Sequence, residues 1–273
     1  MQYYVYKNIL RMKNLIIGNT SQLSHYFPVL YDRISSRNVQ ISNEQYNKVF
    51  FCFGEHRTFI ETDEKMFTDI NVDYTIKLID QFKDSCNKII LYSTCELWNN
   101  CEGAVNLNIP FNYNYSPYIK SKEIIYNYLQ ENKENYPNVV ILYPFNFNSP
   151  YRKPGFLFSK IIDSIINKRK IEIGDTYFYR DFIHPKYLTL QSMKAESDKL
   201  VGSGRLLHVN DFIRDLYKGM NLNYNDYVTE NFNHNLKLKR KIFYYDSNEV
   251  SYTYDSLLKD TLEDIKKYVP KTF

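Results

Sequence analysis

Short apolar runs that alternate with helical segments constrain the fold of this chain more than any other feature. Four such runs end in glycine or polar residues and have the length of strands buried on both faces of a sheet: KNLIIG (13–18), KVFFCFG (48–54), KIILYST (88–94) and VVILYPFN (139–146). Between them, residues 71–82 and 118–133 repeat apolar residues at helical spacing. This alternation predicts an α/β fold with a doubly wound parallel sheet of the Rossmann type.

Two further elements complete the expected first domain. A polar turn after the first strand leads into LSHYFPVLY (23–31), whose apolar residues recur at roughly helical spacing and predict a helix. A short strand is expected near 32–36. We place this domain at 12–150 and expect it to bind NAD(P) at the carboxyl ends of its strands, where doubly wound sheets bind dinucleotides. Residues 1–11 are expected to be a peripheral arm.

The pattern changes after Pro150. Two amphipathic helices are predicted at 155–170 and 251–269, with short strands between them. We therefore expect 151–273 to form mainly a smaller C-terminal substrate-binding lobe packed on the first domain, with some segments returning to the sheet.

Charge and composition argue against several classes of partner. The 273 residues include 35 basic and 31 acidic residues spread along the chain, so no basic stripe predicts nucleic-acid binding. No apolar run reaches the roughly 18 residues that span a bilayer, and the N-terminus lacks a signal-peptide core. We expect a cytoplasmic protein without a membrane partner. The four cysteines have no C-x-x-C spacing, so neither a metal site nor a disulfide framework is expected.

The turn after the first strand has the small residues of a dinucleotide-binding loop. In a doubly wound sheet, ligands bind at the carboxyl ends of the strands. The G-x-x-S-x-x-S pattern of 18–24 lets the backbone approach a pyrophosphate, while the N-terminus of a following helix supplies N–H groups. An ordinary strand–helix turn explains this pattern equally well. The cofactor candidates in this loop are Gly18, Thr20, Ser21, Gln22 and Leu23.

The turns after the next two strands contain further cofactor candidates. Ser36, Arg37 and Asn38 stand where NAD-binding enzymes carry a carboxylate for the ribose 2′-hydroxyl. Arg37 can pair with a 2′-phosphate instead, so we expect NADP(H) rather than NAD(H); a solvated loop arginine is the alternative. Phe53 and Gly54 are candidates for the wall of the cofactor site, whereas the sequence offers no account of the charged residues 55–57 that follow.

Tyr118 and Lys122 are spaced so that both lie on one face of the helix expected at 118–133. An ammonium group beside the phenol can lower its pKa from about 10 and also bind the nicotinamide ribose. Tyr118 could then act as an acid or base near neutral pH. A hydroxyl from Ser93 or Thr94 would bind the substrate oxygen and stabilise the alkoxide that develops during hydride transfer.

Taken in order, these segments resemble the extended short-chain dehydrogenase/reductases that act on nucleotide sugars. That family carries S-[ST]-x-x-[VLI]-Y-G, Y-x-x-S-K, R-P-x-N-x-Y-G-P and R-D-[FY]-[IV]-H-V-x-D. The matching segments here are S-T-C-E-L-W, Y-I-K-S-K, Y-P-F-N-F-N-S-P and R-D-F-I-H, within 13–185. The resemblance implies hydride chemistry by Tyr118, Lys122, Thr94 and Ser93 on a nucleotide-diphosphate sugar. It also implies a homodimer formed through the helices at 71–82 and 118–133.

Departures from the family motifs bear on the reaction. Sugar 4,6-dehydratases carry T-D-E where this chain has Thr94-Cys95-Glu96, and a thiol with a pKa of about 8.5 is a poor acid for a leaving hydroxyl. Epimerase-reductases similar to GDP-fucose synthase carry a Cys at the position of Glu96, so that Cys95 is one residue out of place for that role, and a His where Tyr151 or Arg152 stands here. Glu96 remains a candidate base. We therefore expect a 4-keto reductase that makes a deoxysugar for surface glycans.

Substrate contacts are expected in the second half of the chain. Arg180 of R-D-F-I-H can bind a phosphate through two hydrogen bonds; the alternative is a structural pair with Asp181 or Asp175. Asn146 and Arg152 are further substrate-binding candidates.

Two other functions stay open. One is a nucleotide-sugar epimerase that keeps its NAD(P) tightly bound. The other is a non-catalytic regulator that binds a dinucleotide, which the degenerate glycine loop favours and the retained Tyr118, Lys122 and Thr94 oppose. His184 is expected to be a packed or hydrogen-bonded residue rather than a catalyst.

Overall fold

The computed structural model describes residues 13–40, 44–58, 63–231, 241–246 and 252–268, so the expected arm at 1–11 lies outside the described residues. The chain divides into two compact units. Unit 1 comprises Met1–Leu97, Tyr113–Tyr143 and Thr189–Lys199, and unit 2 comprises Trp98–Asn112, Pro144–Leu188 and Leu200–Phe273. The proposed boundary at 150 and the substrate-binding role of the second half stay predictions.

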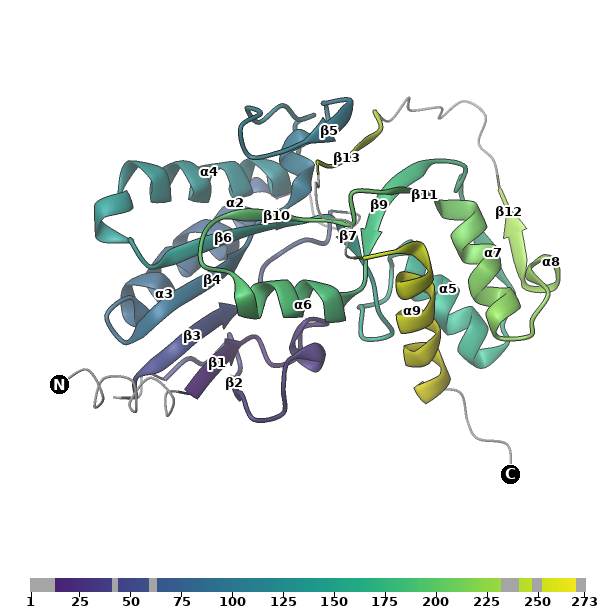
Figure 1. The fold of residues 1–273 in the computed structure, drawn as a ribbon, viewed down its shortest axis with the longest axis horizontal. Coiled ribbons are helices and arrows are strands. Elements are labelled where there is room, and N and C mark those ends of the chain that lie inside the picture. Colours follow the sequence, from purple (N-terminus) through teal and green to yellow (C-terminus); the bar gives the residue numbers. More distant parts are fainter. Residues whose placement is uncertain (1–12, 41–43, 59–62, 232–240, 247–251, 269–273) are drawn as a thin grey trace. The chain divides into compact units, whose positions relative to one another are not determined.

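Unit 1 is built on a parallel sheet with strand order β6-β4-β3-β1-β2 (Figure 1). The strands are β1 (Lys13–Ile17), β2 (Asp32–Ile34), β3 (Tyr46–Phe51), β4 (Cys86–Tyr92) and β6 (Val139–Pro144). β10 (Lys199–Val201), at whose first residue unit 1 ends, extends the sheet beside β6. Ile17, Phe51 and Leu91 are paired across β1, β3 and β4, and all three are buried, as expected for a sheet covered on both faces. The predicted Rossmann-type sheet is confirmed.

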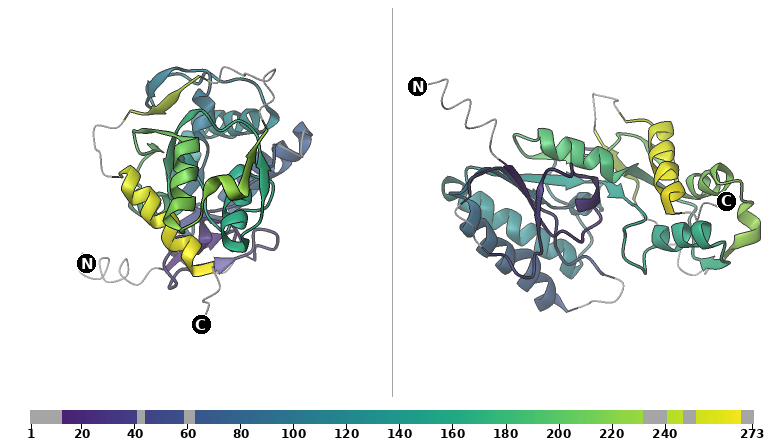
Figure 2. Two further views of the ribbon diagram at one scale, coloured as in Figure 1. Left: turned by 90° about the vertical axis from the view of Figure 1, so that its right-hand side faces the viewer. Right: turned by 90° about the horizontal axis from the view of Figure 1, so that it is seen from below.

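Helices cover both faces of this sheet. α3 (Tyr74–Phe82) and α4 (Pro117–Glu131) lie together on one face, and the part of α6 (Pro185–Lys194) from Thr189 on lies on the other (Figure 2). α3 continues a short helix, α2 (Glu64–Thr68), through one π-helical turn, η2 (Asp69–Asp73). The helices predicted at 71–82 and 118–133 are thus confirmed.

The helix predicted at 23–31 is wrong. Only one 3₁₀ turn, η1 (Ser24–Tyr26), follows β1. Phe27 is extended because it precedes Pro28, whose ring disfavours a helical conformation of the preceding residue. In addition, the Arg33 guanidinium donates hydrogen bonds to backbone carbonyls that a helix would use internally. These carbonyls belong to Ser24, Phe27, Pro28, Val29 and Tyr31.

Unit 2 combines short strands with amphipathic helices. Its described strands form one three-stranded sheet, with the order β11-β9-β7, and two separate two-stranded sheets, β12-β8 and β13-β5. The strands are β5 (Gly103–Val105), β7 (Asn146–Phe147), β8 (Ile171–Ile173), β9 (Tyr179–Ile183), β11 (Leu206–His208), β12 (Val228–Glu230) and β13 (Phe243–Tyr245). The helices are α5 (Leu157–Asn167), α7 (Val209–Gly219), α8 (Tyr224–Tyr227) and α9 (Tyr254–Tyr268). α5 and α9 confirm the helices predicted at 155–170 and 251–269. Within the described ranges, no helix has the length and apolar character needed to cross a membrane.

Candidate active site

Gly18 directly follows β1 and has a backbone conformation that a larger residue adopts only with strain. Its φ is +103°, and a Cβ at this position would lie 2.6 Å from the carbonyl oxygen of Cys52. The loop that follows folds on itself, since the Ser24 hydroxyl donates to the carbonyls of Asn19 and Ser21. Because no helix follows, the helix N-terminus that we expected to face a pyrophosphate is absent, and that part of the prediction is wrong. Of the loop candidates, Thr20 is exposed, Ser21 and Gln22 are half-buried, and Leu23 is buried.

Gly18→Ala is expected to lower the free energy of unfolding by about 3 kcal/mol, because the methyl group would clash with backbone atoms at an unfavourable φ. Urea denaturation would measure the loss. Gly174→Ala is the matched control, since a Cβ there meets no atom within 4 Å. Equal losses in the two variants would contradict the close approach at Gly18.

The turn after β2 presents its candidates at the surface. Arg37 and Asn38 are exposed, and the carbonyl of Ser36 accepts a hydrogen bond from the Tyr74 hydroxyl. Arg37, which we expect to select a 2′-phosphate, is therefore exposed to solvent. The turn that carries it is held to α3 by the hydrogen bond from Tyr74.

The turn after β3 accounts for the charged residues that the sequence left unexplained. The Glu55 carboxylate is buried and accepts hydrogen bonds from the Arg57 guanidinium and from the backbone N–H groups of His56 and Arg57. Burial opposes its ionisation, but these hydrogen bonds and the charge of Arg57 hold its pKa at about 2. The Glu55 carboxylate thus organises the loop directly after Gly54. Phe53, on the other side of that glycine, packs edge-on against Tyr74, with ring centroids 5.7 Å apart.

Asn71 is a site residue that the sequence analysis missed. Its side chain is buried in the π-helical turn, accepts from the backbone N–H of Glu55 at 2.8 Å and donates to the Ser121 hydroxyl at 3.0 Å. Ser121 in turn donates to the carbonyl of Tyr118. Asn71 therefore ties the turn after β3 to α4. An asparagine inside a helical pattern carries no signal for partners so distant in the sequence.

α4 carries both members of the predicted Tyr–Lys pair. The Ser116 hydroxyl caps the helix and Pro117 begins it, which places Tyr118 in the first turn. Lys122 is 7% exposed, and its Nζ donates to the carbonyl of Tyr92 at 3.1 Å and lies 5.9 Å from the centroid of the Tyr118 ring. Burial lowers the pKa of Lys122 to about 8. Phe67 packs edge-on against the Tyr118 ring.

Ser93 and Thr94 follow directly on the carbonyl that Lys122 binds. Both are buried, and the Ser93 hydroxyl has no hydrogen-bond partner within the described part of the chain. The Thr94 hydroxyl accepts from the backbone N–H of Glu96, the second residue of the 3₁₀ turn η3 (Cys95–Trp98). This leaves the hydrogen of the Thr94 hydroxyl as a donor.

Contacts within unit 1 join these predicted residues at one edge of the sheet. A Cβ on Gly54, in the turn after β3, would lie 3.7 Å from Nζ of Lys122, which donates a hydrogen bond to the last residue of β4. The carboxyl ends of the two strands and the Tyr–Lys face of α4 therefore meet at the place where a doubly wound sheet binds ligands.

The predicted substrate residues Asn146, Arg152 and Arg180 belong to unit 2, and their role stays a prediction. The Arg152 guanidinium stacks 3.7 Å from the centroid of the Phe156 ring, and Arg180 donates to the carbonyl of Tyr179. The amide of Asn146 donates to the carbonyl of Asp181 at 3.5 Å.

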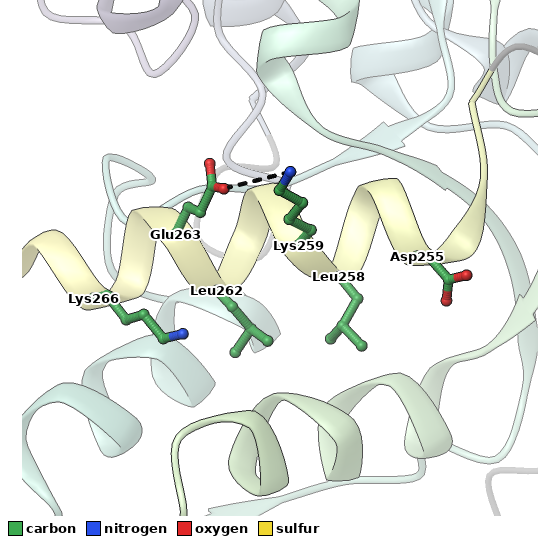
Figure 3. A pocket seen from close by; sticks show the side chains of 6 residues that line it. All are labelled: Asp255, Leu258, Lys259, Leu262, Glu263 and Lys266. Atoms are coloured by element: carbon green, nitrogen blue, oxygen red, sulfur yellow. Dashed lines mark ion pairs between the residues drawn. The ribbon is translucent and has the colours of Figure 1, made fainter.

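Unit 2 also contains a hollow of about 370 Å³ along α9 (Figure 3). Leu258 and Leu262 point to one side of the helix, and Lys259 forms an ion pair with Glu263 at 4.0 Å. Its lining includes none of the predicted site residues, so we do not assign the active site to it.

Comparisons with known proteins come from sequence and from structure. The model of the NAD dependent epimerase/dehydratase family matches residues 34–186. No curated protein matches the sequence. The fold is similar to that of UDP-glucose 4-epimerase from Thermotoga maritima with UDP-glucose, with a TM-score of 0.77 and 16% identity over 95% of this chain and 100% of that one.

Two further solved structures are similar. RMD from Pseudomonas aeruginosa complexed with NADPH has a TM-score of 0.74 and 14% identity, over 94% of this chain and 100% of that one. A double mutant of DesIV, the dTDP-glucose 4,6-dehydratase from Streptomyces venezuelae, with NAD bound, has a TM-score of 0.75 and 14% identity, over 94% and 97%. At these identities the likeness shows a shared fold.

Proposed function

Since the chain belongs to the NAD dependent epimerase/dehydratase family, we propose that it is an NADP(H)-dependent reductase of a nucleotide-linked 4-keto deoxysugar. The family match also confirms the resemblance to the extended short-chain dehydrogenase/reductases. One observation carries the proposal: the buried Lys122 ammonium donates to the carbonyl of Tyr92, the residue before Ser93 and Thr94, and lies 5.9 Å from the centroid of the Tyr118 ring. We further propose that the enzyme acts in the cytoplasm as a homodimer and serves surface-glycan biosynthesis.

Each of these side chains has a role in the reduction. A bound nicotinamide dinucleotide supplies the hydride. Tyr118 donates a proton to the sugar carbonyl oxygen as that oxygen becomes a hydroxyl. Lys122 holds a positive charge beside the phenol and binds the cofactor ribose, and the hydroxyls of Ser93 and Thr94 stabilise the developing negative charge.

The residues of unit 1 fit a nicotinamide dinucleotide at the nicotinamide end. The Lys122 ammonium is bonded to the last residue of β4, and the hydroxyl of Ser93, the next residue, has no hydrogen-bond partner among the described residues. Arg37, in a turn without a carboxylate, favours NADP(H).

The missing helix after β1 favours a reductase over an epimerase. A helix N-terminus stabilises a bound anion by about 0.3–2 kcal/mol and also supplies N–H donors, and the single turn η1 cannot supply them in the same way. A weaker hold on the diphosphate lets the cofactor leave after each turnover. A reductase requires this exchange, whereas an epimerase keeps its cofactor and recycles the hydride.

The test is an assay of the purified protein with NADPH or NADH and a panel of nucleotide-linked 4-keto-6-deoxysugars. We expect substrate-dependent loss of reduced-cofactor absorbance, faster with NADPH. Co-purified NAD together with interconversion of sugars and no net oxidation would instead indicate the epimerase. Cofactor binding without any turnover would indicate the non-catalytic regulator.

The pH dependence should report the charge of Lys122. Because burial lowers its pKa from 10.5 to about 8, we expect kcat/KM for NADPH to fall about tenfold per pH unit above pH 8. Lys122→Arg keeps its charge throughout this range, so the descending limb should vanish from its residual activity. An unchanged limb in that variant would assign the titration to another group. Folding stability should rise between pH 8 and 10.5, since the unfolded chain binds the proton more tightly there.

A further inference from the structure

Asn148 carries a buried carboxamide whose hydrogen-bonding atoms are both unused. The residue is 9% exposed, and neither Oδ1 nor Nδ2 has a hydrogen-bond partner among the described residues. Most buried polar side-chain atoms in proteins are paired, and one left unpaired costs about 1–3 kcal/mol. A buried amide with two unpaired atoms therefore lowers the folding stability of unit 2, and such a group is uncommon in proteins.

Another buried asparagine of the same unit shows the ordinary situation. Asn210 is fully buried, its Nδ2 donates to Thr176 and Glu230, and its Oδ1 accepts from Arg214. Asn148 has the same side chain as Asn210, but its carboxamide has no hydrogen-bond partner among the described residues.

The place of Asn148 in the chain points to a ligand. It directly follows β7 and comes four residues after Pro144, the last residue of β6, and ligands of doubly wound sheets bind beyond the carboxyl ends of the strands. The turn that follows is held by a hydrogen bond from the backbone N–H of Arg152 to the carbonyl of Ser149. In the segment Y-P-F-N-F-N-S-P, the second asparagine stands where the related family motif has a tyrosine.

We propose that the Asn148 carboxamide is a ligand contact that pairs with a group able both to donate and to accept a hydrogen bond. Two parts of the ligands in the proposed function have this chemistry: a hydroxyl of the sugar and the carboxamide of the nicotinamide. The inference rests on that proposed function. Asn148 is kept at a cost to the free protein because a ligand satisfies it, as expected at functional sites.

The test compares Asn148→Leu with Asn210→Leu, a matched replacement of a buried asparagine that has partners. We expect the Tm of the ligand-free protein to rise by about 2–6 °C in Asn148→Leu and to fall by a similar amount in Asn210→Leu. Calorimetric titration of wild type and Asn148→Leu with NADPH and with UDP-glucose or dTDP-glucose then gives the affinities. Asn148→Ala repeats the comparison without the bulk of leucine.

A loss of about tenfold or more in affinity supports the inference. If only the nucleotide sugar loses affinity, the partner is a sugar hydroxyl; if only NADPH does, it is the nicotinamide carboxamide. A fall in Tm for both Asn148 variants, or affinities equal to those of wild type, would overturn the inference and leave the proposed function standing. Wild-type protein that binds neither ligand would overturn both.

Discussion

Tyr118→Phe is expected to lower kcat for ketosugar reduction by about 10³-fold, because the variant lacks the hydroxyl that donates the proton. The phenyl ring keeps its edge-on packing against Phe67, and Lys122 keeps its hydrogen bond to Tyr92, so the fold and the affinity for NADPH should change little. Steady-state rates with the best substrate of the panel, together with the Kd for NADPH, would measure the effect.

Tyr115→Phe is the control for this variant. Tyr115 is exposed and directly precedes the N-cap residue Ser116, and its hydroxyl donates to Glu64. Its loss should leave kcat within about twofold of wild type. If Tyr118→Phe kept more than a tenth of the activity, Tyr118 would not be the proton donor.

Asp181→Ala is expected to lower the free energy of unfolding by about 3–5 kcal/mol. The carboxylate is fully buried on β9 and accepts hydrogen bonds from Ser203 through its N–H and hydroxyl, and from the N–H groups of Gly204 and Tyr245. Removing it leaves three backbone N–H groups without their partner, each at a cost of about 1–3 kcal/mol before relaxation. Arg180, the neighbour on β9, points to the other face of the strand.

The single tryptophan makes the measurement specific. Trp98 is fully buried and belongs to unit 2, so its fluorescence during urea denaturation reports on the unit that contains Asp181. Asp211→Ala is the matched control, because its side chain is 71% exposed and its pairing with His208 at 3.1 Å is solvent-screened. The control should change stability by less than about 1 kcal/mol. Similar losses in both variants would contradict the structural role of Asp181.

The strands and the Tyr–Lys pair were predictable from the sequence because their causes are local. The run of Val49, Phe50 and Phe51 is apolar at successive positions, which is typical of a strand buried on both faces of a parallel sheet. The helical spacing of Tyr118 and Lys122 places them on one face of any helix that contains both.

The remainder depended on contacts that no local pattern contains. The apolar spacing of 23–31 resembles a helix, yet Arg33 holds five backbone carbonyls of that segment and Pro28 keeps Phe27 extended, so only one turn forms. Asn71 contributes to the site only because the fold brings Glu55 and Ser121 to its amide. Local propensity therefore accounts for where the strands and most helices lie, whereas the partners of buried polar groups were decided by tertiary packing, since a buried polar atom must take whichever donors and acceptors the fold brings to it.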